Sequence, residues 1–210
     1  MVIGTACAWF LCTSIAQTFN ANAVQGKSMI EVRLKKTSVS ARLIVLEVTV
    51  KNSGPEVAYI VTDTRRTDGS PGPYIIVDKD DPTMLVCTSQ FYPPNPFGPF
   101  SDGTSAHITR LDPGQTHAEL MRISVPLQTT EPPYTSVPGS RAIPATAIRQ
   151  LEVRIGVLET SLSLRELIKR KLAPHDAFTG MEQIGIGSTP RALYDLQEVV
   201  RSNVVGISLD

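Results

Sequence analysis

The sequence carries no net charge, few aromatic residues and only three cysteines. Twenty Lys and Arg residues balance twenty Asp and Glu residues, so the chain has no long-range positive field to attract phosphate backbones. Nucleic acid is therefore not an expected partner. Cys87 is the only cysteine outside the first twelve residues, and the only tryptophan is Trp9. Core packing, rather than a disulfide framework, must hold the fold together.

What the chain does contain is typical of one globular domain rich in turns. Its 210 residues are 41% hydrophobic and 19% charged, and no internal repeat divides them. This composition excludes a disordered chain, a collagen and a coiled coil. Sixteen prolines and fourteen glycines are scattered along the sequence, which favours many short strands over long helices.

The N-terminus has the features of an export signal. The apolar stretch Val2–Ala16 precedes the first charged residue, Lys27, and is shorter than the ~20 residues of a membrane-spanning helix. Ala21-Asn22-Ala23 fits a signal peptidase site. We therefore expect residues 1–23 to be a signal peptide and the mature protein to be periplasmic or extracellular. No basic residue precedes the apolar stretch, so an uncleaved anchor that contacts the membrane through residues 1–23 and a segment buried in a larger assembly stay as alternatives.

Hydrophobic residues recur at every second position along much of the remaining chain, as in strands with one buried face. Leu151, Val153, Ile155 and Val157, for example, alternate with Glu152, Arg154 and Gly156. The predicted strands are Ile30–Lys35, Ile44–Lys51, Val57–Thr62, Tyr74–Val77, Met84–Thr88, His107–Leu111, Thr116–Val125, Leu151–Leu158 and Gln197–Leu209. The last stretch could also continue a helix begun at Thr189-Pro190, but its β-branched residues favour a strand.

Two further local signals concern a turn and a helix. Asp112-Pro113-Gly114-Gln115 has proline and glycine where a tight turn needs them, which predicts a hairpin between the strands on either side. In that hairpin His107 would lie opposite Leu120, and the two flanking histidines would point to opposite faces. Ser163–Leu172 has apolar residues at helical spacing, so we expect a short helix within a helical and loop insertion over residues 159–196.

The stretch Val48–Val57, which contains Asn52-Ser53-Gly54, and the later Leu111-Asp112-Pro113-Gly114 resemble bacterial immunoglobulin-like or fibronectin-III-like domains. The resemblance covers about Ile30–Leu158 and implies an immunoglobulin-like β-sandwich of seven or eight strands over residues 24–210. The Cys…Trp…Cys core of antibody domains is missing. Such sandwiches serve adhesion, scaffolding or recognition, so the resemblance alone does not choose a function.

Motifs for catalysis and for metal binding are missing or incomplete. The chain has no Gly-x-Ser-x-Gly elbow and no Cys-His signature, and Gly185-Ile186-Gly187-Ser188 lacks a phosphate-binding context. Asp78, Asp80 and Asp81 resemble an acidic calcium loop, but Lys79 interrupts them and solvated turn residues explain them as well. We therefore expect no enzyme activity, no metal and no cofactor; a hydrolase with unidentified residues is the weakest alternative.

The most unusual stretch is the loop Gln90–Ala106. Phe91, Tyr92, Phe97 and Phe100 lie close together there, among four prolines that restrict the backbone. Such rings suit a protein interface or a platform for sugars, although they could instead fold back and plug the end of the sandwich. We expect a non-catalytic interaction module, an accessory or structural subunit that docks to a protein partner in a membrane or envelope complex. The alternative is a soluble carbohydrate- or ligand-binding module that uses the four aromatic residues.

Overall fold

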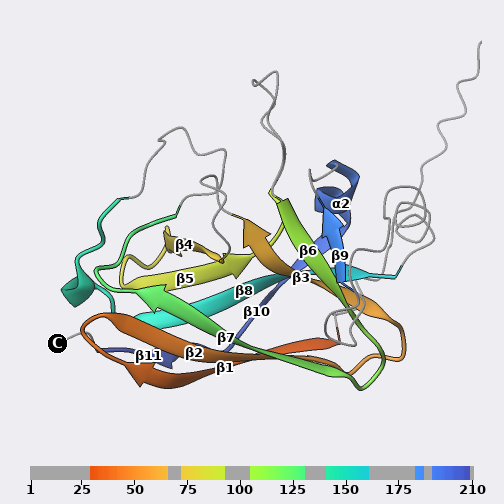
Figure 1. Cartoon of the computed structure of the whole chain (residues 1–210), viewed down its shortest axis with the longest axis horizontal. Coiled ribbons are helices and arrows are strands. Elements are labelled where there is room, and N and C mark those ends of the chain that lie inside the picture. Colours follow the sequence, from red (N-terminus) through yellow and green to blue (C-terminus); the bar gives the residue numbers. More distant parts are fainter. Residues whose placement is uncertain are drawn as a thin grey trace, which may run out of the picture.

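The computed structural model describes residues 29–65, 72–92, 105–130, 141–160, 183–186 and 191–208. These residues form two packed β-sheets, so the prediction of an all-β fold is confirmed (Figure 1). The smaller sheet has the order β1-β2-β7, and the larger has the order β4-β5-β8-β3-β6-β9, with β10 and β11 also paired to β8. The strands are β1 (Ile30–Val39), β2 (Leu43–Asn52), β3 (Ala58–Arg65), β4 (Tyr74–Val77), β5 (Met84–Ser89), β6 (Ser105–Leu111), β7 (Thr116–Ser124), β8 (Gln150–Glu159), β9 (Gln183–Ile186), β10 (Gln197–Arg201) and β11 (Val205–Gly206).

The smaller sheet follows the two-residue period of its sequence. Ile44, Leu46, Val48 and Val50 of β2 are fully buried against the larger sheet, while the residues between them are partly exposed. In β7, Met121 and Ile123 pack into the same core, and Leu120 on the other face is exposed. Because side chains alternate between the faces of a strand, one face of this sheet forms the core and the other faces solvent.

Strand β8 is more buried than its alternating pattern predicts. Leu151, Val153, Ile155 and Val157 enter the core between the sheets, as expected. Glu152 on the opposite face is only 5% exposed, and Gly156 is buried as well. The pattern predicted an amphipathic strand with one exposed face. In the structure, neighbouring strands pair with both edges of β8, and other segments of the chain cover its second face.

The predicted hairpin over Asp112–Gln115 is wrong. The turn itself forms, with Gly114 at a φ of 79°, but β6 and β7 belong to different sheets. His107 in β6 lies opposite Thr62 of β3, and His117 in β7 lies opposite Val50 of β2. The turn therefore carries the chain from one sheet to the other, because each flanking strand pairs with a partner from earlier in the sequence.

The C-terminal prediction is confirmed in its main feature. Strands β10 and β11 lie within the predicted stretch Gln197–Leu209, and a short helix, α2 (Arg191–Leu196), precedes them directly after Pro190. Strand β9 lies inside the expected insertion and was not predicted. The predicted helix Ser163–Leu172 and the segment 1–23 lie outside the described residues. Among the helices that are described, none is long and apolar enough to cross a bilayer.

Buried Asn52 links the two sheets where the chain passes between them. Its Nδ2 donates hydrogen bonds to the carbonyl oxygens of Glu56 (2.8 Å) and Leu111 (3.0 Å), and its Oδ1 accepts one from the backbone of Gly54 (2.9 Å). Its backbone N–H donates to Gln115, and its carbonyl accepts from Gly114. One side chain thus satisfies the backbone of two separate turns, which explains why the inter-sheet turn forms here.

The substitution Asn52→Ala is expected to lower the free energy of unfolding by about 2 kcal/mol, because it leaves buried backbone groups without partners. Chemical denaturation followed by circular dichroism measures the change. Ser53→Ala, at the exposed neighbouring position, is the control and is expected to have little effect. Equal stability of Asn52→Ala and the wild type would contradict this role.

Candidate functional site

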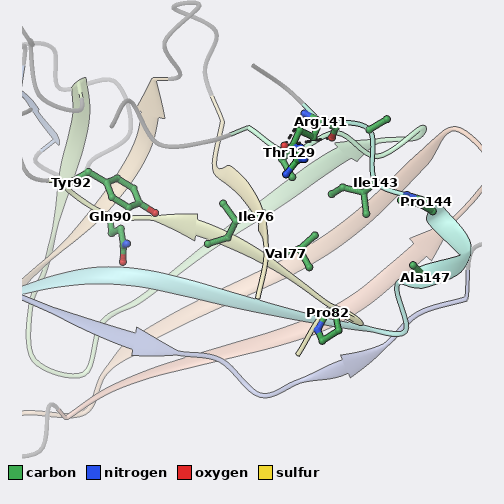
Figure 2. A pocket seen from close by; sticks show the side chains of 11 residues that line it. Ile76, Val77, Pro82, Gln90, Tyr92, Thr129, Arg141, Ile143, Pro144 and Ala147 are labelled. Carbon is green, nitrogen blue, oxygen red and sulfur yellow. Dashed lines mark hydrogen bonds between the residues drawn. The ribbon is translucent and has the colours of Figure 1, made fainter. Parts of the chain in front are cut away.

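A pocket of about 730 Å³ lies beside β4, one of the edge strands of the larger sheet. Its walls include Ile76, Val77, Pro82, Tyr92, Ile143 and Pro144. Figure 2 shows Tyr92 and Gln90 at one end, Pro144 and Ala147 at the other, and Ile76 and Val77 between them. The pocket is thus elongated along the strand, lined mainly by apolar side chains.

The opposite wall is a small ribbon, formed by residues 127–130 and 141–143. Its two segments are joined by hydrogen bonds from Thr129 N to the carbonyl of Arg141 (2.8 Å) and from Ile143 N to the carbonyl of Leu127 (2.9 Å). Leu127 is fully buried in the core and anchors the ribbon. The ribbon touches the β4 backbone at one isolated bridge, between Ile75 and Thr130. The pocket lies where the ribbon and β4 diverge beyond that bridge.

The divergence leaves part of the β4 backbone unpaired. Ile75 donates its N–H to Thr130 Oγ1 (2.6 Å) and accepts from Thr130 N (2.8 Å), so its polar groups point away from β5. Backbone groups alternate in direction along a strand, so the N–H and C=O of Val77 point the same way. No partner for them occurs among the described residues. The pocket therefore offers one free donor and one free acceptor between apolar walls.

The structure describes two of the four predicted aromatic residues and separates them. Phe91 is fully buried with Tyr59, Val61, Ile108, Leu158 and Leu193 on the outer face of the larger sheet. Tyr92 lines the pocket and packs edge-on against Tyr74, with ring centroids 5.3 Å apart. Burial raises the pKa of the Tyr92 phenol. Phe97 and Phe100 lie outside the described residues.

Gln197 of β10 holds the backbone that carries these rings. Its amide Oε1 accepts from Phe91 N (2.9 Å), and its Nε2 donates to the Phe91 carbonyl (2.6 Å). The side chain crosses Gly156 of β8, where an added Cβ would lie 2.5 Å from Gln197 Oε1 and 3.2 Å from Gln90 Cα. A glycine is required here because the Gln197 side chain and the backbone at Gln90 both lie over β8 at close range.

A charged network lies on the same outer face as Tyr92. Arg154 donates from Nε to Glu152 (2.7 Å) and from its terminal nitrogen to Asp78 at the end of β4. These side chains are 17%, 7% and 12% exposed, respectively. The backbone N–H of Asp80 and the Arg154 guanidinium hold the pKa of the Asp78 carboxyl below its ordinary value. The network joins β8 to the end of β4.

Asp78 and Asp81, from the run that resembles a calcium loop, instead accept hydrogen bonds from the loop that follows β4. Asp78 Oδ1 accepts from the backbone of Asp80 (2.9 Å), while Asp81 Oδ1 accepts from both the backbone and the hydroxyl of Thr83. Within the described ranges, no group of three or more His, Cys, Asp or Glu side chains could hold a metal ion. Cys87 is fully buried in the core.

Sequence reasoning missed the pocket walls. In the sequence, Val77 and Ile143 are ordinary apolar residues. The free edge of β4 depends on how many of its residues pair with the ribbon, which the sequence does not show. The short length of Tyr74–Val77 and the prolines that follow Val125 were the available signals for an interrupted edge.

The substitution Asp78→Asn is expected to lower the free energy of unfolding by about 1–3 kcal/mol at neutral pH, because it removes a charged hydrogen-bond acceptor. Since the folded-state pKa lies below 3.8, the wild-type carboxylate stabilises the fold above that pH and loses the effect as the pH falls through the folded-state value. The difference from the wild type should therefore shrink in acid. Thermal unfolding of both proteins across pH measures it, with exposed Asp80→Asn as the control; a difference that does not change with pH would contradict the assignment.

Comparisons with known protein families, with curated proteins and with solved structures found no match to this chain. The geometry of the site is therefore the main indication of function.

Proposed function

We propose that this protein is a non-catalytic, exported interaction module, an accessory or structural subunit of a membrane or envelope complex, and that its β4 pocket binds an extended segment of a protein partner. The observation that carries the proposal is the unpaired backbone of Val77 inside an elongated apolar pocket. An extended peptide can add to such an edge through main-chain hydrogen bonds, while pockets for its side chains supply specificity.

The charge of the pocket indicates the chemistry of that segment. Arg141 lines it with an exposed side chain, and no Asp or Glu is among the lining residues. Within the described part of the chain, no carboxylate pairs with the Arg141 guanidinium. A segment with apolar side chains and one carboxylate would therefore fit, because Arg forms charge-assisted hydrogen bonds with carboxylates.

One sequence feature and one structural feature support the rest of the proposal. The apolar stretch Val2–Ala16 supports export. The two packed sheets and the corner at Asn52-Ser53-Gly54 support an immunoglobulin-like or fibronectin-III-like architecture, in which strand edges are common docking sites.

A second candidate is a carbohydrate- or ligand-binding module. The position of Tyr92 favours it, because this ring lines a pocket whose volume lies within the ~300–1,000 Å³ typical of small-molecule sites. Phe91 does not contact a ligand in this second candidate, since its ring is fully buried; it helps to hold the loop in place through the hydrophobic cluster beneath it.

Selection from a library of random peptides against the wild-type protein tests the proposal. We expect apolar peptides with a carboxylate, and we expect Val77→Pro to weaken their binding about tenfold, because proline removes the free N–H but none of the β4–β5 hydrogen bonds. Fluorescence polarisation measures the affinities. Arg141→Glu should also weaken binding, while Thr49→Lys, on the outer face of the smaller sheet, should not.

Circular dichroism must show that each variant is folded. Failure to select any peptide, or equal binding to all variants, would contradict the proposal. Sugar binding on a glycan array that Tyr92→Ala abolishes would support the second candidate instead.

A further inference from the structure

Another strand edge among the described residues is β7, at one end of the smaller sheet (Figure 1). The hydrogen bonds from Val125 N to Arg42 O and from Asn52 N to Gln115 O fix the direction of its backbone groups. Odd-numbered residues of β7 bond to β2, and even-numbered residues point away from it. Thr116, Ala118, Leu120, Arg122 and Ser124 thus present their N–H and C=O groups outward, and no described residue pairs with them.

Two other strand edges in the described structure, those of β1 and β4, are partly protected. Leu34 on the free side of β1 donates to Asn203 Oδ1 (2.8 Å) and accepts from its Nδ2 (3.0 Å), and a bulge follows at Lys36. Strand β4 has only four residues and is partly covered by Thr130. By contrast, β7 runs for nine residues with no proline, lysine or bulge, three of the devices that block pairing at an edge. Its charged residues are Glu119 on the inner face and Arg122 on the outer face.

We propose that β7 pairs antiparallel with β7 of a second copy of this chain, around a two-fold axis at Leu120. This inference goes beyond the proposed function and does not depend on it. The outward-pointing residues are symmetric about Leu120, so Leu120 meets its own copy, Ala118 meets Arg122, and Thr116 meets Ser124. Each hydrogen-bonded pair exchanges two bonds, so the five pairs form about ten, a number typical of a stable interface.

The side chains also favour a second copy as the partner. Leu120 is 54% exposed in the single chain, and the pairing brings the two Leu120 side chains together. On the inner face, Glu119 would lie opposite Met121 and His117 opposite Ile123, so no like charges meet across the axis. The formal net charge of zero removes the long-range repulsion that would keep two copies apart. Together the two small sheets form one sheet of six strands.

Sedimentation equilibrium of the full chain from about 1 to 100 μM tests this pairing, a range that covers micromolar affinity. We expect the wild type to reach twice the chain mass within that range. Leu120→Lys places two like charges at the axis, and Leu120→Pro removes an outward N–H that β2 does not use, so both should remain monomeric.

Thr49→Lys is the matched control, because it adds the same charge to the same face of the sheet but away from the edge; it should still dimerise. Thermal unfolding shows whether the variants are folded. A wild type that stays monomeric at 100 μM would overturn the inference. A dimer that survives both Leu120 substitutions would also overturn it, since association would then use another surface.

Discussion

The pairing of β8 along both of its edges is the constraint on which this fold depends. On one edge, β5 pairs with residues 150–155 and β3 with residues 157–159; on the other, β11 and β10 pair with the same stretches. Gly156 lies where β5 ends and β3 begins. Its lack of a side chain lets the chain at Gln90 leave the sheet and pass over β8. A bulkier residue at this position would force these segments apart.

Amide side chains complete the backbone pairing where strands end. Asn52 forms hydrogen bonds with the backbone of the turn between the sheets. In the same way, the side-chain amide of Asn203 bonds to the backbone of Leu34, and that of Gln197 bonds to the backbone of Phe91. Each replaces a ladder hydrogen bond that the backbone geometry cannot supply, which avoids the cost of buried unpaired groups. Against this background, the free groups at Val77 and along β7 stand out as available for partners.

Much of the fold followed from local patterns. Two-residue periodicity predicted the strands well because one buried face is enough to impose it, as in Ile44–Val50. It did not reveal strand partners: the turn at Asp112–Gln115 has the residues of a hairpin, yet Asn52 directs it between the sheets. Nor did it reveal that Glu152 is buried, because that depends on Arg154 and Asp78 meeting across three strands.

The candidate site was less predictable. The aromatic residues of the loop marked its neighbourhood, but Phe91 is buried in a hydrophobic cluster while Tyr92 lines the pocket beside β4. Both rings lie on the outer face of the larger sheet, and the packing of distant segments decides which one is covered. The backbone of Val77 has no sequence signal, since its availability depends on where the ribbon leaves β4.

Residue-resolved amide hydrogen exchange, at a concentration low enough to keep the chain monomeric, tests the central claim most directly. The account predicts slow exchange throughout β8, and alternating exchange along β7, fast at even-numbered residues and slow at odd-numbered ones. It also predicts fast exchange at Val77 between protected neighbours. Uniform protection along β7, together with a protected Val77, would show that these edges are already paired within one chain and would contradict the account.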